Sequence, residues 1–384
     1  MININKKALI ITSRNLNKKG SGEFYKIISF IKSLQKIGYE VVILNINFKK
    51  SKINSFYNAK VIHRYPNLFK AFISFIRYFP TSIQRSLFAS NFNLSNFENF
   101  DLILFSLLRT TPYFVNEIKK PLIIDLADLL SINFSRISKK SKGFIAKIKL
   151  LESFLLYFDE EKICKKNIAL LVSRTELKVL KKRNLKAFHL IQASPLSLAS
   201  SNKYLEIKYQ PKNNLLFVGP NSYLPNHKAL LWIDNYIGPR LNKNFSIDWI
   251  GRNDREFNYE YINSLGFVDD LAAEIVNAGI NIVPIDIATG VQNKLIDCIF
   301  LGSNCFTLRK LIRPIGISLP NNIYSFDTLN ELGEAVLNFA NNLENLENKT
   351  KFALNYNFGL DSFKNRLEDY INEANSYYKN RGIR

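Results

Sequence analysis

One segment of the chain combines residue types that suit a phosphate group. It reads DIATGVQNKLIDCIFLGS (286–303), follows a strand expected at 281–285, and has Gly290 at the start of an expected helix whose first turn carries Gln292 and Lys294. Such a turn offers unpaired N–H groups and a partial positive charge, to which the Lys294 ammonium adds a full charge. A solvated lysine in an ordinary helix fits the same spacing.

A carboxylate follows on the same helix. Asp297 comes about two turns after Gly290, on the same face, where it could accept hydrogen bonds from ribose hydroxyls. The sequence thus predicts a nucleotide site at the carboxyl end of this strand, which is where doubly wound α/β domains bind their ligands.

A glycine-containing loop follows the first expected strand. In RNLNKKGSGEFYK, Gly20 and Gly22 precede a helix and could let backbone amides approach an anion. A dinucleotide fingerprint requires a third glycine, where Tyr25 stands, and its ring would block close helix–strand packing. This substitution argues against a nicotinamide enzyme, and a flexible turn explains the two glycines equally well.

Other polar residues follow expected strands. Asp128 comes after 121–127, and Arg252 and Asn253 come after 246–251. We consider them candidate ligand contacts, although each alone is more often a loop charge.

The sequence does not predict a metal or disulfide site. The three histidines lack the spacing of metal ligands, and the three cysteines form no C-x-x-C pair; these residues are His63, His189, His227, Cys164, Cys298 and Cys305. There is no Asp-x-Asp triplet after a strand, no G-x-S-x-G sequence and no Walker sequence. We expect no cofactor, no metal and a reducing compartment.

The elements that must position these residues alternate between short apolar strands and helical stretches, which is typical of parallel α/β sheets. We expect strands at 8–13, 40–46, 60–65, 101–106, 121–127, 169–174, 187–192, 214–219, 246–251, 281–285 and 304–308. The predicted fold is two Rossmann-like doubly wound domains facing across a cleft. Their ranges are 1–195 and 214–360, with a linker at 196–213 and a closing helix at 361–384.

Charge is distributed unevenly along the 384 residues, which carry a net charge of +21. Residues 1–190 hold 34 Lys/Arg against 12 Asp/Glu, whereas 191–384 hold 19 against 20; within the first half, 132–190 is densest, with 15 basic and 5 acidic residues. A basic half of this kind attracts a polyanion or an anionic membrane, or it serves solubility alone. The apolar run at the N-terminus is too short for a signal peptide, and no stretch approaches the ~20 residues of a membrane span. We expect a soluble or peripheral protein.

Two stretches of the sequence resemble a known protein family closely enough for the family to be named. NLLFVGPNSYLPNHKALLWI (214–233) and SLGFVDDLAAEIVNAGINIVPIDIATGVQNKLIDCIFLGS (264–303) resemble GT-B-fold glycosyltransferases of the family 4 type, especially bacterial polysaccharide-building members. DLILFSLLRTTPYF (101–114) and PLIIDLADLLS (121–131) follow the same order. The resemblance extends over nearly the whole chain and is strongest at 214–303.

The resemblance implies retaining, metal-independent transfer of a sugar from a nucleotide-diphosphate donor held by the C-terminal domain to an acceptor held by the N-terminal one. It assigns the donor to the residues Gly290, Val291, Gln292, Lys294 and Asp297, the amides of 290–292 contacting the diphosphate. We add Gly219 and Arg252 as expected donor contacts, with Arg252 as a substitute for the basic pair that relatives have after this glycine. Lys294 and Asp128 form the expected catalytic set.

The chain departs from the family pattern at several positions. Thr289 and Asp297 stand where many members have two glutamates, and Pro220 and Asn226 stand near the places of an arginine and a lysine. Ala127 replaces a histidine of some relatives near the acceptor.

Three hypotheses follow. The first is a cytoplasmic glycosyltransferase that extends a lipid-linked or surface polysaccharide, peripheral on the inner face of the membrane. The second is a non-catalytic GT-B-like subunit that binds a nucleotide-sugar, which the departures at Thr289 and Asp297 favour. The third, a nucleic-acid-binding protein, lacks a recognisable reading module, and we expect no nucleic acid as a partner.

Overall fold

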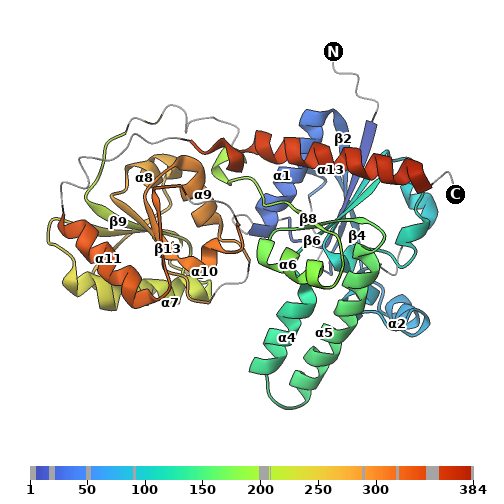
Figure 1. The fold of residues 1–384 in the computed structure, drawn as a ribbon, viewed down its shortest axis with the longest axis horizontal. Helices are drawn as coiled ribbons and strands as arrows, with labels where there is room; N and C mark the ends of the chain where they lie inside the picture. Colours follow the sequence, from blue (N-terminus) through green and yellow to red (C-terminus); the bar gives the residue numbers. More distant parts are fainter. Residues whose placement is uncertain are drawn as a thin grey trace. The chain divides into compact units, whose positions relative to one another are not determined.

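The computed structural model describes residues 6–16, 22–48, 53–89, 92–198, 207, 209–287, 290–316, 320–342 and 354–381. The chain forms two compact units (Figure 1). Unit 1 contains Met1–Gln192 and Leu360–Arg384, and unit 2 contains Ala193–Gly359. The helix expected at 361–384 therefore belongs to unit 1. Much of the expected linker, 199–206 and 208, lies outside the described residues.

Unit 1 is built on an eight-stranded sheet of order β3-β4-β2-β1-β5-β6-β7-β8. Its strands are β1 (Lys6–Thr12), β2 (Tyr39–Ile46), β3 (Ser55–Phe56), β4 (Ala59–Arg64), β5 (Leu102–Ser106), β6 (Leu122–Ala127), β7 (Ile168–Leu171) and β8 (Phe188–His189). All neighbours are parallel except β3 and β4. The central strands β1 and β5 contain the buried apolar runs 8–11 and 102–105, as expected for strands covered on both faces. The seven strands expected here are confirmed, with shifted ends, and only the two-residue β3 was missed.

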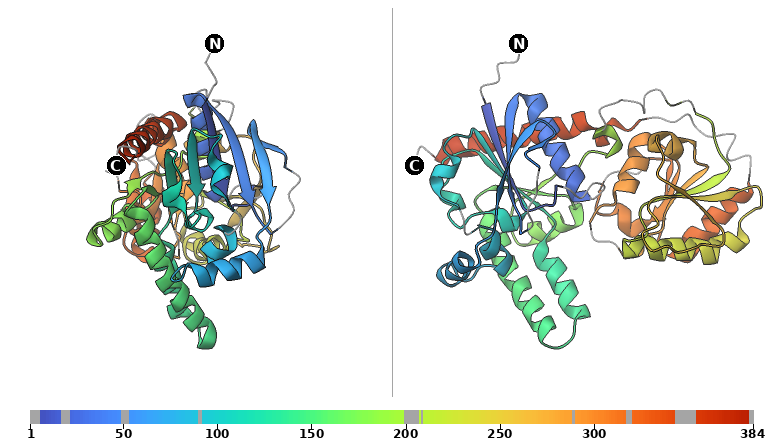
Figure 2. Two further views of the ribbon diagram at one scale, coloured as in Figure 1. Left: turned by 90° about the vertical axis from the view of Figure 1, so that its right-hand side faces the viewer. Right: turned by 180° about the vertical axis from the view of Figure 1, so that it is seen from behind.

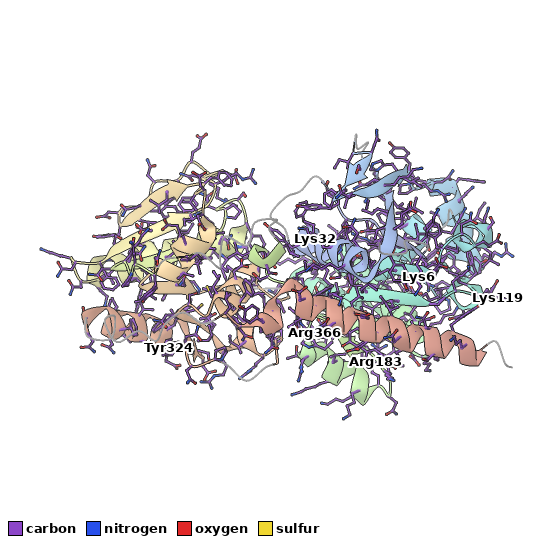
Figure 3. The ribbon with its side chains drawn as sticks, turned by 90° about the horizontal axis from the view of Figure 1, so that it is seen from above. Lys6, Lys32, Lys119, Arg183, Tyr324 and Arg366 are labelled. Atoms are coloured by element: carbon purple, nitrogen blue, oxygen red, sulfur yellow. The ribbon has the colours of Figure 1, made fainter. Side chains whose placement is uncertain are left out.

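The helices of unit 1 are α1 (Gly22–Ile37), α2 (Leu68–Arg77), α3 (Ile83–Ala89), α4 (Leu130–Lys140), α5 (Gly143–Cys164), α6 (Arg174–Lys182) and α13 (Leu360–Arg381). The apolar side chains of α1 are buried, and Gly38 ends it with a left-handed φ of 102°. The α13 helix, on which Arg366 is labelled in Figure 3, packs against α1, with the Phe30 and Phe363 rings 5.4 Å apart. The α4 and α5 helices form a hairpin that projects from the body of unit 1 (Figures 1 and 2).

Unit 2 contains a six-stranded parallel sheet of order β11-β10-β9-β12-β13-β14. Its strands are β9 (Asn214–Val218), β10 (Ser246–Ile250), β11 (Ile262–Gly266), β12 (Ile280–Val283), β13 (Cys305–Leu308) and β14 (Ile323–Phe326). Its helices are α7 (Leu224–Trp232), α8 (Leu271–Asn277), α9 (Asn293–Leu301), α10 (Arg309–Ile312) and α11 (Leu329–Asn341). The strand order reverses between β9 and β12, which makes that point the switch point of the sheet. The sequence missed β11 and β14.

The described helices include none that is long and apolar enough to cross a bilayer.

Candidate active site

The loop after β9 begins at a glycine that no other residue could replace without strain. Gly219 has a φ of 137°, and a Cβ there would lie 2.6 Å from Asn226 Nδ2. Its amide donates to Ile250 O at 2.8 Å, and its carbonyl accepts from Trp249 Nε1 at 2.7 Å. Gly219 therefore fixes a tight turn at the carboxyl end of β9, beside the switch point.

The helix on the other side of the switch point starts later than expected. Gly290 does not open it, because its left-handed φ of 76° turns the chain and Gln292 is still extended. The helix α9 begins at Asn293, and Gln292 O accepts the amides of Leu295 and Ile296. No described residue accepts a hydrogen bond from the amides of Gly290, Val291 or Gln292. The three amides precede the helix and remain available to a ligand.

Lys294 lies in the first turn of α9, between the two loops. Its Nζ donates to Asn226 Oδ1 at 2.8 Å and stands 4.0 Å from the centre of the Phe217 ring. None of the ion pairs formed within the described residues includes Lys294.

The environment of Lys294 has an electrostatic consequence. The residue as a whole is half-buried, but protein surrounds its ammonium end, and this burial lowers the pKa of Lys294 to about 7. The amide oxygen and the aromatic ring compensate the positive charge of this ammonium only in part. An anionic ligand at this position would stabilise the charged form.

Asp297 lies one turn further along α9 and is buried. Its Oδ1 accepts from Ser194 Oγ at 2.5 Å and from the Leu196 amide at 3.5 Å, and burial raises the pKa of the carboxyl to about 7. The Ser194 amide in turn donates to Phe358 O at 2.8 Å. In this structure Asp297 anchors the start of unit 2, and its predicted contact with a ribose stays a prediction.

Arg252 and Asn253 lie in the loop after β10. The Arg252 side chain is 59% exposed, and its Nε lies 3.8 Å from Asp254 Oδ1. Asn253 Oδ1 accepts from Asn221 Nδ2 at 2.5 Å. This loop supports the turn after Gly219.

Sequence reasoning assigned no role to the residue that supports that turn most directly. Arg255 Nε donates to Asn221 O at 2.8 Å, and the Arg255 amide donates to Asn221 Oδ1 at 3.1 Å. Asn226 was noted only as a departure from the family pattern, yet it holds the Lys294 ammonium. Neither contact is visible in the sequence, because the partners lie 34 and 68 residues apart.

Asp128 lies in unit 1, after β6. It follows Ala127, whose φ of 62° is unusual for a residue with a side chain, and its amide donates to Leu126 O at 2.9 Å. The neighbouring Glu176 accepts the Leu129 amide at 2.9 Å. Burial, followed by the Asp128 charge, raises the pKa of Glu176 to about 7. Asp128 thus stands beside a second carboxyl group at the end of the strand.

A buried ionic cluster near the centre of unit 1 was not predicted. Asp125 of β6 lies 3.7 Å from Arg14 Nη2 and 3.8 Å from Lys26 Nζ, and all three side chains are at most 3% exposed. Arg14 Nε donates to Ser106 Oγ at 3.2 Å, and Lys26 Nζ donates to Leu190 O. Arg14 Nη2 and Asp125 Oδ2 find no hydrogen-bond partner among the described residues. Burial lowers the pKa of Lys26 to about 8.

The remaining predicted residues are quickly placed. Gly22 begins α1, whereas Gly20 and Thr289 lie outside the described residues. His63 Nε2 and His189 Nε2 each lie 2.8 Å from a backbone oxygen, of Ile53 and Val172 respectively. In the described part of the chain, no three His, Cys, Asp or Glu residues are grouped as a metal site would require.

Comparison by sequence finds no matching family model and no matching curated protein. Comparison by structure finds proteins that align over almost the entire chain. Sucrose-phosphate synthase from Thermosynechococcus elongatus aligns with a TM-score of 0.63 at 11% identity, covering 97% of this chain and 100% of the other. HepE from Anabaena, in complex with UDP and glucose, aligns with a TM-score of 0.60 at 11% identity, covering 96% and 100%.

A third structure extends the comparison. TarM from S. aureus, in complex with UDP, fondaparinux and α-GlcNAc-glycerol, aligns with a TM-score of 0.55 at 9% identity, covering 98% of this chain and 99% of the other. These likenesses confirm the predicted GT-B fold, with its two parallel-sheet α/β domains.

Proposed function

We propose that the protein is a glycosyltransferase that uses a nucleotide-diphosphate-sugar, with Lys294 binding the donor diphosphate at the switch point of unit 2. The observation that carries the proposal is the Lys294 ammonium. It is enclosed by Phe217 and Asn226 and lacks a carboxylate partner within the described residues. It belongs to the first turn of α9, which follows three amides that find no acceptor among the described residues.

The chemistry follows from this geometry. When the bond between the sugar and the diphosphate breaks, negative charge develops on the leaving diphosphate. Preorganised donors in a site with little water stabilise such charge far better than donors in bulk solvent do. We assign this role to Lys294 Nζ and to the amides of Gly290, Val291 and Gln292, while Gly219 lets the diphosphate approach the backbone closely. Retention of anomeric configuration and transfer without a metal are parts of the proposal.

The acceptor belongs to unit 1 in this proposal, with Asp128 as the polar group that contacts it. We expect a glycan or a lipid-linked glycan, and we expect the protein to work in the cytoplasm on the inner face of the membrane. The net charge of +22 on residues 1–190 supports an anionic surface as the place of work. HepE and TarM have structures with UDP, which makes UDP the first nucleotide to test.

One observation favours the second hypothesis, a non-catalytic subunit that binds a nucleotide-sugar. The carboxylate expected to hold the ribose is hydrogen-bonded to Ser194, and Thr289 stands where relatives have the first glutamate. A subunit of this kind would bind the donor without turning it over.

The experiment measures binding and turnover separately. Thermal unfolding is followed with UDP, GDP and ADP, since a bound ligand stabilises the folded state by mass action. Hydrolysis and transfer are then measured with the corresponding sugar donors. We expect stabilisation and turnover with one nucleotide series, both lost in Lys294→Ala. The matched control is Lys228→Ala, which removes an exposed lysine of α7 in the same unit. Stabilisation without turnover would favour the subunit, and equal stabilisation of Lys294→Ala would refute the site.

A further inference from the structure

Unit 1 carries an apolar and basic surface formed by α2 and the α4–α5 hairpin, which we call the docking face. We infer that the docking face inserts into the interfacial layer of a membrane that contains anionic lipids. The inference adds to the proposed function the surface through which unit 1 contacts the membrane. It rests on the proposed function for one point only, which is that an acceptor-binding unit has a reason to contact a membrane.

The α5 helix presents large apolar side chains to solvent instead of to the protein. Phe144, Ile148 and Leu151 follow the i, i+4, i+7 spacing of one helix face, and Leu150 and Phe154 lie beside them. All five are exposed, Phe144 to 76%. About three turns of α5 thus have an apolar outer side, and monomeric soluble proteins rarely expose such side chains as a continuous patch.

Polar contacts join the two helices of the hairpin. Ser138 Oγ donates to Ala146 O at 2.9 Å, and Ser153 Oγ donates to Ser131 O at 2.7 Å. Glu160 accepts from the Ser131 amide at 2.9 Å. Toward the body of unit 1 the hairpin also buries apolar side chains, Leu155 and Leu156 of α5. The exposed phenylalanine and leucine side chains nearer the tip therefore add to a helix that already has a buried apolar side.

The α2 helix adds a second apolar face. Phe69, Phe72, Ile73 and Ile76 repeat at i, i+3, i+4 and i+7, and Phe69 and Phe72 are 74% and 63% exposed. Only Ala71 of this helix is buried. The α2 helix therefore contributes little to the core of unit 1 and presents its apolar side chains to solvent.

Buried ionic contacts fix α3 and the residues just before it, which follow α2 in the chain, to α5. Asp159 of α5 accepts from Arg85 Nη1 at 2.6 Å and from the Ser82 amide at 2.8 Å, and Glu152 accepts the Ile83 amide at 2.9 Å. These residues hold the segment after α2 against α5. At the base of the hairpin, Arg183 stacks on the Tyr157 ring at 3.6 Å (Arg183 is labelled in Figure 3). The docking face is a preformed part of unit 1.

The charge of the docking face selects its partner. Residues 130–151 contain six basic and no acidic residues, and α2 adds Lys70 and Arg77 without any acidic residue. A second copy of the chain would bring the same positive charge, and a nucleic acid would leave the phenylalanine side chains in water. An anionic lipid surface supplies both a negative charge and an apolar layer, which are the two partners that basic amphipathic helices require.

Vesicle flotation of the full chain tests the inference. We expect flotation with vesicles of phosphatidylcholine and 30% phosphatidylglycerol, weakened by high salt, and little flotation with phosphatidylcholine alone. Phe144→Ser/Ile148→Ser should lower the partition coefficient at least about ten-fold, because two exposed apolar side chains no longer enter the lipid. The matched control Phe267→Ser, at a residue 80% exposed in unit 2, should have no effect.

The charges are tested in the same assay. Lys140→Gln/Lys142→Gln should lower partitioning about five-fold for each lysine, since a basic residue near an anionic surface contributes about 1 kcal/mol. Lys228→Gln/Lys243→Gln in unit 2 is the control. Equal flotation on neutral vesicles, or an unchanged partition coefficient in both docking-face variants, would overturn the inference. So would self-association of the chain that requires Phe144 and replaces lipid binding.

A fluorescence measurement locates the contact. The described cysteines, Cys164, Cys298 and Cys305, are all buried, so a thiol introduced by Phe144→Cys can be labelled selectively with an environment-sensitive dye. The dye should shift to the blue on anionic vesicles and be quenched by spin-labelled acyl chains, whereas the same dye on Phe267→Cys should do neither. An unchanged spectrum at position 144 would refute insertion. None of these readouts needs sugar transfer, so failure of the docking face leaves nucleotide binding at Lys294 open to its own test.

Discussion

Lys294 of unit 2 and Lys26 of unit 1 each lie near the start of a helix at the carboxyl end of a parallel sheet, and burial of the ammonium lowers the pKa of both. The Lys26 ammonium has a carboxylate, a backbone oxygen and an aromatic ring as its partners. Its ammonium lies 3.8 Å from Asp125 Oδ1, donates to Leu190 O and stands 5.7 Å from the Phe363 ring. Among the described residues, the contacts of the Lys294 ammonium are an amide oxygen and an aromatic ring.

The difference between the two lysines shows how one arrangement serves two purposes. The fold places an ammonium at the same kind of position in each unit, and the neighbouring groups decide what the charge does. Where a carboxylate is buried beside the ammonium, the two charges compensate each other within the protein. Where none is present, the charge is available to a ligand. Mutations that remove one partner at a time test this distinction.

The largest effect is expected from Asp125→Ala. The substitution leaves Arg14 and Lys26 as buried cations without a counter-ion, and breaking a buried pair from one side costs about 3–5 kcal/mol. Urea unfolding followed by circular dichroism measures the loss. Glu373→Ala is the control, because it breaks the exposed pair with Lys186 in the same unit, where about 0–1 kcal/mol is expected. Equal stabilities of the two variants would remove the structural role of the cluster.

Lys294→Met should have the opposite profile. Because no described carboxylate pairs with Lys294 and would be left behind, the free energy of unfolding should change little or rise. Turnover should fall about 10²–10³-fold, the range seen when one preorganised donor is removed from a transition state. Steady-state kinetics and urea unfolding of one preparation check both parts. A variant that loses activity together with several kcal/mol of stability would place Lys294 in the same class as Lys26.

Nucleotide binding should depend on pH through Lys294. In the free protein its pKa of about 7 leaves the amine largely neutral at pH 8, and a bound diphosphate raises that pKa, so binding takes up a proton. Affinity should be highest below pH 7 and fall by up to about ten-fold per unit as pH rises through 7 toward the pKa of the complex. Titration calorimetry in buffers of different ionisation enthalpy measures how many protons are taken up on binding. Lys294→Arg, which stays charged, should bind without uptake, and uptake that persists in this variant would point to another group.

The smallest effect is expected from Asp297→Asn. Burial raises the folded-state pKa of Asp297 to about 7, above about 3.9 in the unfolded chain, so its contribution to stability is present below that lower value and is lost as pH rises through 7. The asparagine keeps an oxygen for Ser194 and has no charge to bury. At pH 8 the variant should be more stable than wild type by about 1 kcal/mol, and at pH 4 it should not be. Chemical unfolding at the two pH values decides, and a variant that is less stable at pH 8 would contradict the expected sign.

The sequence predicted the architecture well because several buried parallel strands contain continuous apolar runs, as in β5 and β7. It missed β11, whose residues INSLG are mostly polar and exposed. The sequence predicted the start of α9 three residues too early, because a glycine can begin a helix or turn the chain, and its residue type does not tell which. The pairing of Lys294 with Asn226 joins residues 68 positions apart and needs the fold to be seen.

One missed feature did leave a signal. Asp125 interrupts the apolar run PLIIDLA, and a carboxylate in a fully buried strand requires a partner. The sequence could therefore have predicted a buried cation in unit 1, although not which lysine or arginine supplies it. The sequence indicated the docking face only through the excess of basic residues at 132–190. It could not show that the apolar side chains of α2 and α5 are exposed, because amphipathic spacing alone does not tell which side of a helix faces the protein.

The return of α13 to unit 1 has a consequence for how the protein is made. Phe363 and Leu367 of α13 are fully buried, so the core of unit 1 stays open until the last helix has been synthesised. Unit 2 is contiguous in the chain and leaves the ribosome before that helix does. Nascent chains should therefore complete their second unit first, while the first unit waits for its final segment with apolar surface still uncovered.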